Sequence, residues 1–286
     1  MFRYLRTIRD HRQLVADFVR RDLRARYVGS SMGFFWSVVF PIINLIVFTF
    51  VFRMILNARW SDFQDGTTVA VIMLMGIVIW SAFAESMSRC TNSLVENSNL
   101  IQKVVFPAEV LPTYMVISSL INMLISFPVV LAAVIWLGYV DPITDPAVLA
   151  KMAEAGDPGF NLGPSLVVLP LLLLLQGLLT AGLGMFFAAF NLFWRDTFHL
   201  MGVALTVWMF ATPIFYPALA VERKGFGWLL DLNPMHWLID SYRRIGLNGQ
   251  WPEWSRLGML ALVSMLLLHL GSSFFRSQKN RFPDLL

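Results

Sequence analysis

The sequence predicts an all-α integral membrane protein with six transmembrane helices. Of its 286 residues, 57% are hydrophobic and only 14% are charged, whereas an ordinary soluble domain carries about 25% charged residues. The mean hydropathy is +0.64, and a soluble fold could not hide so much apolar surface. In addition, six apolar stretches have about the 20 residues that a helix needs to cross a bilayer.

The predicted spans share this apolar character and occupy residues 33–56, 69–87, 114–140, 166–190, 198–216 and 257–275. The third is long and contains Pro128. We expect a single transmembrane domain over 1–286, made of an N-terminal cytoplasmic amphipathic segment (1–32), a six-helix membrane domain (33–275) and a cytoplasmic tail (276–286).

The distribution of basic residues predicts that both termini are cytoplasmic. With that orientation, 14 of the 22 Lys and Arg residues lie on the inner side, most of them before residue 33. Basic residues are retained preferentially on the cytoplasmic side of membrane proteins. The net charge of +4 therefore indicates membrane topology, and we expect membrane lipids as contacts and no nucleic acid.

A basic amphipathic helix is predicted before the first span. Apolar residues recur there at helical spacing, from Leu14 and Phe18 to Tyr27, and the same stretch carries Arg20, Arg21, Arg24 and Arg26. This pattern is typical of a helix that lies in the headgroup layer. A plain topology anchor would carry the same pattern, and periodicity does not separate the two.

Two connecting segments have further organisation. Residues 217–254 combine apolar runs with basic residues and a break at Asn233-Pro234, which predicts a re-entrant helical hairpin at the outer end, between spans five and six. Residues 93–112 join spans two and three and predict a short cytoplasmic amphipathic helix that stops before Pro107. Such a helix can dock into a groove of a soluble partner.

Catalytic motifs are not found. The sequence has no phosphate-binding loop, no H-E-x-x-H and no G-x-S-x-G, so ATP hydrolysis is not expected on this chain. Cys90 is the only cysteine, and the four histidines are scattered. We therefore expect no catalytic residue, no cofactor and no metal site.

Two features in or near the predicted spans have alternative explanations. Glu85 and Arg89 are four residues apart and suit an ion pair on one helix face, because a proton relay would need further ionisable groups across the membrane. The abundant aromatic residues suit interfacial belts. Alternatively, some could line a conduit for a glycan, with these as candidates: Phe34, Phe35, Phe40, Trp208, Phe210, Phe215 and Tyr216.

The connecting segment also carries a family resemblance. Residues 99–112 read NLIQKVVFPAEVLP and resemble the NLIKKVxFPxxxLP element of polysaccharide-exporting ABC transporter permeases of the ABC-2 type. Four other motifs agree in order along the chain: DLRARY with SMGFFW (22–36) and Pro41, FWRD (193–196), TPIFYP (212–217), and LNPM (232–235) with Tyr242-Arg243. Met32 departs mildly from the usual Leu.

The resemblance implies half of an exporter. Two copies would form the pore, and two separate ATPase subunits would hold ATP and Mg²⁺. The cargo would be a lipid-linked polysaccharide such as O-antigen, teichoic acid or capsule, with the closest likeness to the O-antigen branch in a bacterial inner membrane. An exporter of small amphiphilic molecules or drugs, and a membrane-embedded lipid-modifying enzyme, are the alternatives.

The resemblance also assigns expected roles to residues. The partner ATPase would push on the connecting helix through Leu94, Glu96, Asn97, Asn99, Leu100, Lys103 and Phe106. The lipid-pyrophosphate head would enter beside Arg20, Arg24, Arg26 and Tyr27, because guanidinium groups bind phosphate bidentately. Lipid headgroups and topology are the competing explanation for these arginines.

Overall fold

The computed structural model describes residues 2–26, 33–57, 60, 66–103, 106–140, 150, 152, 154 and 159–286. These residues form helices and connecting segments, with no strand among them. Within this part of the chain, five helices are long and apolar enough to cross a membrane: Trp36–Ile55, Gly66–Glu96, Val110–Tyr139, Pro164–Phe193 and Trp254–Leu285. Each overlaps one of the stretches predicted from the sequence. The chain is therefore a membrane protein with several apolar helices.

The elements follow one another in this order: α1 (Phe2–Asp10), α2 (Arg12–Ala25), η1 (Gly33–Phe35), α3 (Trp36–Phe48), η2 (Thr49–Ile55), α4 (Gly66–Glu96), α5 (Ser98–Lys103), α6 (Val110–Ile135), η3 (Trp136–Val140), η4 (Pro164–Val168), α8 (Leu169–Phe193), α9 (Thr197–Ala211), α10 (Ala218–Arg223), α11 (Gly227–Asp231), α12 (Pro234–Gly246), α13 (Trp254–Gln278), η5 (Lys279–Arg281) and α14 (Phe282–Leu285).

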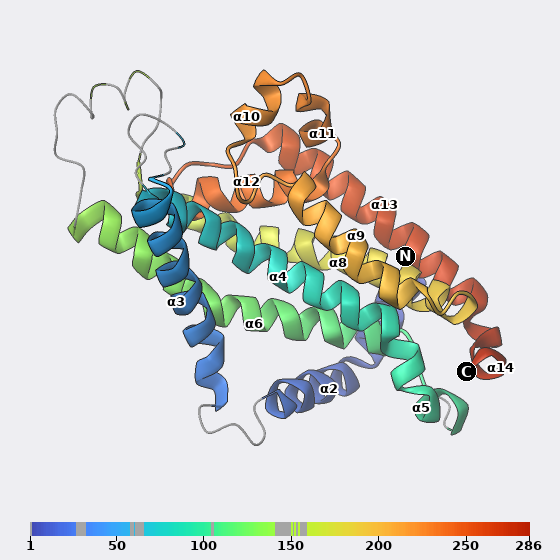
Figure 1. Cartoon of the computed structure of the whole chain (residues 1–286). Coiled ribbons are helices and arrows are strands. Elements are labelled where there is room, and N and C mark those ends of the chain that lie inside the picture. Colours follow the sequence, from blue (N-terminus) through green and yellow to red (C-terminus); the bar gives the residue numbers. More distant parts are fainter. Residues whose placement is uncertain are drawn as a thin grey trace.

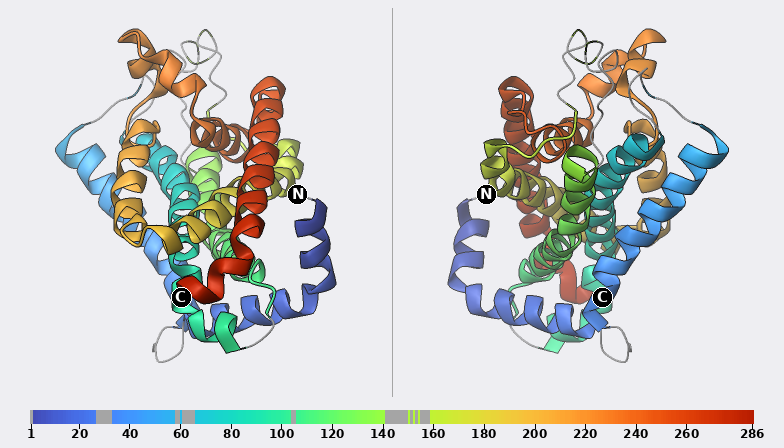
Figure 2. Two further views of the ribbon diagram at one scale, coloured as in Figure 1. Left: turned by 90° about the vertical axis from the view of Figure 1, so that its right-hand side faces the viewer. Right: turned by 90° about the vertical axis from the view of Figure 1, so that its left-hand side faces the viewer.

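The long helices form a bundle with distinct ends. In Figure 1, α4, α6, α8 and α13 run through the bundle, α3 leans outward, and α2 lies across one end near α5. Figure 2 shows α10 and α11 at the opposite end, while α1 rises from α2 along the side. The basic N-terminal segment and the connector after α4 therefore share one end of the molecule.

The closest helix pair is α8 with α13, and two glycines allow the approach. A Cβ built at Gly271 would lie 1.9 Å from the carbonyl oxygen of Gly182, and one at Gly182 would lie 2.5 Å from the backbone of Leu267 and Leu268. The hydrophobic effect does not drive helices together in lipid. Their association depends on close packing, which small residues permit. Glycine at both positions therefore fixes the α8–α13 contact.

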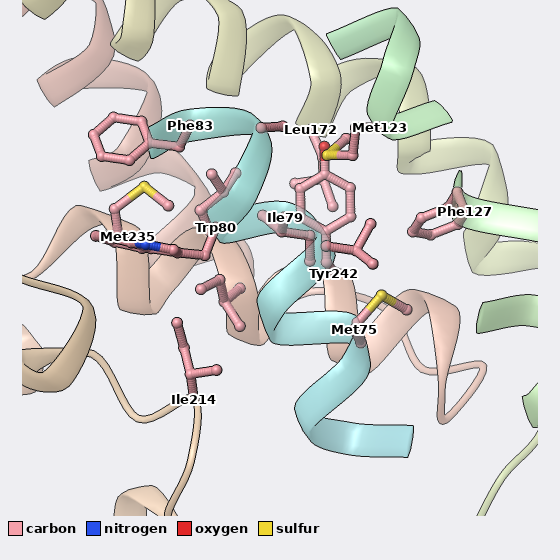
Figure 3. Packing of buried hydrophobic residues seen from close by; sticks show 14 of the residues in the cluster. Met75, Ile79, Trp80, Phe83, Met123, Phe127, Leu172, Ile214, Met235 and Tyr242 are labelled. Atoms are coloured by element: carbon pink, nitrogen blue, oxygen red, sulfur yellow. The ribbon is translucent and has the colours of Figure 1, made fainter. Parts of the chain in front are cut away.

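At the centre of the bundle, α4 is the most enclosed helix. In the most apolar part of the Gly66–Glu96 span, 61% of the residues are buried, whereas the corresponding share for the Trp36–Ile55 span is 6%. Helix α3 therefore lies at the periphery. The Tyr242 ring of α12 sits beside Met75, Ile79 and Phe127 (Figure 3). Its hydroxyl donates to Gln176 Oε1 of α8 at 2.9 Å, and Gln176 Nε2 donates to the carbonyl of Ile79 at 3.3 Å. These bonds join α4, α8 and α12.

The fifth predicted span, 198–216, takes a different form. Helix α9 has 15 residues and ends at Ala211, and Thr212 is already extended, because Pro213 disfavours helical geometry in the residue before it. Fifteen helical residues span about 22 Å, which is less than the roughly 30 Å of hydrocarbon. The sequence-based span was therefore too long at its C-terminal end.

The region after α9 forms three helices. The predicted break lies where Asn233 caps α12, with its side chain accepting from the Met235 amide at 3.1 Å. Pro234 follows at the first helical position, where its missing N–H costs nothing. Helix α12 is largely buried, whereas most of α10 and α11 is exposed.

Candidate functional site

An ion-pair network joins the N-terminal helix α2 to α4. Arg26 Nη1 lies 2.5 Å from Glu85 Oε1, and Arg26 Nε lies 3.2 Å from Asp22 Oδ2. Arg89 pairs with both oxygens of Asp22 and approaches Glu85 at 3.5 Å. The ion pair predicted between Glu85 and Arg89 is thus confirmed, as one edge of a four-residue cluster that also includes Asp22 and Arg26.

The network changes the titration of Asp22. Partial burial alone would raise the pKa of its carboxyl group, but the hydrogen bond and charge of Arg89, with the charge of Arg26, outweigh burial and lower that pKa. Asp22 therefore stays ionised between two arginines, and the cluster holds α2 against α4 at neutral pH.

A cavity of about 680 Å³ lies beside this network, between α3, α4 and α6. Arg26 and Glu85 line it, together with apolar residues such as Phe40 and polar residues such as Asn122 and Ser119. Ser119 Oγ and Arg26 Nη2 are buried without a hydrogen-bond partner among the described residues. Buried polar atoms of this kind favour a polar ligand, because an unpaired donor costs free energy.

The four candidates for the lipid-pyrophosphate entrance have different environments. Arg20 is exposed, with Asp17 3.8 Å away. Arg24 is exposed and forms no ion pair with the described residues. Arg26 is held in the network and lines the cavity, while Tyr27 lies outside the described residues. Arg24 is therefore available to bind a ligand, whereas Arg26 holds α2 against α4.

The connecting segment is a short helix attached to the end of α4. After Glu96 the chain turns at Asn97, whose side chain donates to the Ser93 carbonyl at 2.8 Å, and α5 then begins at Ser98. Helix α14 packs beside α5, and Figure 1 shows both at the same end as α2. The helix occupies only part of the connecting segment of 93–112, because the first residues of that segment continue α4.

The expected coupling residues divide between the surface and the interior. Glu96, Asn99 and Lys103 are exposed, and Asn97, Leu100 and Phe106 are half-buried. Leu94 is fully buried in the core, so its side chain does not offer a contact to another protein. Leu94 therefore packs in the last turns of α4 and is not at the surface as we expected.

Phe106 contacts a residue that sequence reasoning did not single out for the site. Its ring lies 5.7 Å from that of Phe18 in α2, and Phe18 lies 5.2 Å from Tyr114 in α6. The connector and the N-terminal helix therefore touch directly. The helical spacing of Phe18 predicted an apolar face directed to the lipid headgroup layer, and it gave no indication that Phe106 or Tyr114 would contact that face.

The conduit candidates do not form one lining within the chain. Phe35 and Phe40 are exposed near the start of α3, and Phe210 is exposed near the end of α9. Helix α3 begins at the α2 end of the bundle, whereas α9 ends toward α10 (Figure 1). Phe215 and Tyr216 are half-buried beyond α9, and the Phe34 side chain lies outside the described residues.

One side of the Trp208 ring packs against the interior of the bundle. Its ring lies 5.1 Å from Phe83 and 6.1 Å from Trp80, and its Nε1 donates to Asn233 Oδ1 at 2.9 Å. Asn233 Nδ2 also donates to Thr212 Oγ1 at 2.9 Å. Asn233 therefore fastens the end of α9 to the start of α12, and Trp208 is one of its partners.

The described residues form an apolar helix bundle with a cavity beside a basic surface helix, and a short connector is exposed at the same end. Residues 13–247 match the model for the ABC-2 type transporter. The chain belongs to this family.

The curated relatives are named for polysaccharide export. The O-antigen export system permease protein RfbA of Myxococcus xanthus is 31% identical over 285 residues, covering 99% of both chains. An RfbA of Klebsiella pneumoniae is 25% identical, covering 96% of this chain and 95% of the relative. The polysialic acid transport protein KpsM of Escherichia coli is 20% identical, covering 91% of each.

Proposed function

We propose that this chain is the permease subunit of an ABC transporter that exports a lipid-linked polysaccharide of the O-antigen type. The observation that carries the proposal is the similarity over 99% of both chains to an O-antigen export permease. The chain itself is not an enzyme. A separate ATPase subunit would bind ATP and Mg²⁺ and supply the energy.

The proposed complex contains two permease chains and two ATPase subunits in a bacterial inner membrane. With both termini cytoplasmic, α2 and α5 face the ATPases and α10 and α11 face outward. Helix α9 with the residues after it would make the sixth crossing. The peripheral position of α3, of which little is buried, supports a second copy or lipid as its neighbour.

Energy transfer would begin at α5. Its exposed Asn99 and Lys103 and the adjacent Glu96 offer polar contacts to the ATPase, and Leu100 adds an apolar one. Because α5 follows α4 after one turn residue and packs on α14, a push on it would move the central helix. Phe106 would pass the same movement to α2 through Phe18.

Cargo would enter between α2 and α3. Arg20 and Arg24 are exposed on α2 and suit the pyrophosphate of the lipid carrier. The cavity beside Arg26 has the mixed lining that a sugar needs, since hydroxyl and amide groups bind sugar hydroxyls and rings such as Phe40 can stack on sugar faces. Tyr27 and Phe34 flank this region in the sequence.

Reconstitution into liposomes tests the cargo. We expect the permease with its ATPase to hydrolyse ATP faster when a lipid-linked glycan is present, and to move that glycan across the bilayer. Small amphiphilic molecules serve as the comparison. Stimulation by the amphiphiles and none by the glycan would support the drug-exporter alternative, and activity of the permease alone on a lipid would support the enzyme alternative.

A further inference from the structure

A second cavity, of about 650 Å³, lies at the C-terminal end of α13. Its walls come from α1, the residue before α6, the last turns of α13 and the start of η5. None of its lining residues belongs to the cavity beside Arg26. It is therefore a separate feature, and a ligand bound there would be independent of the proposed polysaccharide cargo.

The cavity has an excess of positive charge. Arg3, Arg276 and Lys279 line it against a single acidic residue, Glu109, so its formal charge is +2. Glu109 is 1% exposed, with Lys279 Nζ 2.8 Å from Oε2 and Arg276 Nε 3.6 Å from Oε1. The acid thus fixes two cations in place without neutralising the site.

Two of the cations retain unused donors. The side chain of Arg3 forms no ion pair or hydrogen bond with the described residues. Arg276 has its Nε 3.6 Å from Glu109, and its two terminal nitrogens form no hydrogen bond with the described residues, so they can donate to another acceptor. The hydroxyls of Ser273 and Ser277 line the same cavity. Guanidinium and hydroxyl donors around one space are suited to the oxygens of a phosphate group.

The wall carrying Arg3 is anchored to the bundle. Tyr4, the next residue, is buried and its hydroxyl lies 2.9 Å from Thr113 Oγ1 in α6. Thr113 Oγ1 in turn lies 2.7 Å from the Glu109 carbonyl oxygen. Burial raises the pKa of Tyr4 to about 12, so its hydroxyl keeps its proton at neutral pH. The position of Arg3 relative to Glu109 is therefore fixed by the fold.

We propose that this cavity binds a phosphate-bearing anion, with Arg3 and Arg276 as direct contacts and Lys279 as supporting charge. It lies at the end of a membrane-crossing helix, on the side of the proposed cytoplasmic leaflet. Basic pockets between helices at this level bind the headgroups of anionic phospholipids. A soluble phosphate would use the same contacts, and the two sources are separable by experiment.

The test uses the full-length permease purified in detergent. Its melting temperature and its retained lipids, by native mass spectrometry, are measured with added phosphatidylglycerol, phosphatidylcholine or inorganic phosphate. We expect phosphatidylglycerol to bind and stabilise, and phosphatidylcholine to do neither. Arg3→Gln and Arg276→Gln should each weaken phosphatidylglycerol binding about five-fold, since one basic residue near a charged membrane surface contributes about this factor.

Arg9→Gln is the matched control, because Arg9 lies in the same helix, is exposed, and does not line the cavity; its lipid binding should equal that of the wild type. Stabilisation by inorganic phosphate that Arg3→Gln removes would support the site with a soluble ligand. An unchanged phosphatidylglycerol response in Arg3→Gln overturns the proposal. The Arg3 side chain is exposed and forms no ion pair or hydrogen bond with the described residues, so Arg3→Gln is expected to fold and tests the proposal even if Arg276→Gln does not fold.

Discussion

The ring of Phe106, in the segment between α5 and α6, packs against the ring of Phe18 in α2 with centroids 5.7 Å apart and planes at 53°. This contact connects the segment proposed to receive the ATPase push with the helix proposed to receive the lipid head. Aromatic pairs of this geometry contribute about 0.5–1.5 kcal/mol beyond their burial. A contact of this strength can couple a movement of the connecting segment to α2, and the two rings can still separate when the helices move further apart.

Replacing either ring by alanine should lower substrate-stimulated ATPase activity of the complex several-fold while insertion stays normal. The double variant Phe18→Ala with Phe106→Ala should be no worse than the single ones, because the contact is lost only once. ATPase assays on reconstituted complexes measure this. Additive losses in the double variant would show that the two rings act separately.

Leu100→Ala and Glu96→Ala test the proposed ATPase contact. Glu96 is exposed at the end of α4, Leu100 is half-buried in α5, and neither belongs to the buried core. We expect each variant to reduce coupling, seen as a loss of glycan-stimulated hydrolysis, with an unchanged melting temperature. Gln13→Ala in α2, also exposed, is the control and should retain full coupling; equal losses in all three would argue against a specific site on α5.

Arg24 and Arg26 should give different phenotypes. Arg24 is exposed and unpaired among the described residues, so Arg24→Gln should reduce export of the lipid-linked glycan and leave stability unchanged. Arg26→Gln should instead destabilise the protein by about 1–3 kcal/mol, because Asp22 and Glu85 lose a partly buried partner. Export assays and thermal unfolding in detergent separate the two. Normal export by Arg24→Gln would reject its headgroup role.

Acid should weaken the network through Asp22. Its folded pKa is lowered below the value of 3.8 expected for a free aspartate, so its stabilising contribution is complete above that value. It is lost as pH falls through the folded pKa. Asp22→Asn removes the charge, so the stability gap between wild type and variant should be widest near neutral pH and shrink below pH 3.8.

Unfolding of the wild type and of Asp22→Asn across a pH series measures the difference between their stabilities. Asp17→Asn is the control, since the side chain of Asp17 is 72% exposed and its pairing with Arg20 is loose; it should cost almost nothing at any pH. A gap that stays constant down to the acid limit would mean that Asp22 is not the titrating group.

The glycine contact predicts a contrast within one helix. Gly271→Ala places a methyl group against the Gly182 carbonyl and should destabilise the fold by about 1–3 kcal/mol or more through overpacking. Gly258→Ala, also in α13, meets no atom within 4 Å. It should leave stability unchanged or raise it by up to about 1 kcal/mol, because alanine favours helix. Thermal unfolding in a fixed detergent compares them; equal effects would contradict the packing.

Periodicity and hydropathy predicted the helical membrane class and the places where five long helices lie, because a bilayer demands about 20 apolar residues in a row. They extended the fifth stretch too far, since hydropathy counts Ile214 and Phe215 as apolar although Pro213 interrupts the backbone. The Glu85–Arg89 pair could be predicted from its spacing. Asp22 could not be added, because no local pattern relates residues 67 positions apart.

The site residues show the same limit. The exposure of Glu96 and the burial of Leu94 depend on where α4 ends, which the sequence places only within a few residues. Trp208 looked free to line a conduit, but Asn233, 25 residues later, holds its indole nitrogen. Long-range pairs of this kind arise only when the helices are assembled.

The backbone contact between Gly182 and Gly271 has a mechanical consequence. Two helices that meet without intervening side chains cannot slide past each other, because any shift drives a carbonyl oxygen into the opposite backbone. We therefore expect α8 and α13 to keep their relative position when the protein changes shape. A displacement that opens a passage is expected at the less buried helices, such as α3.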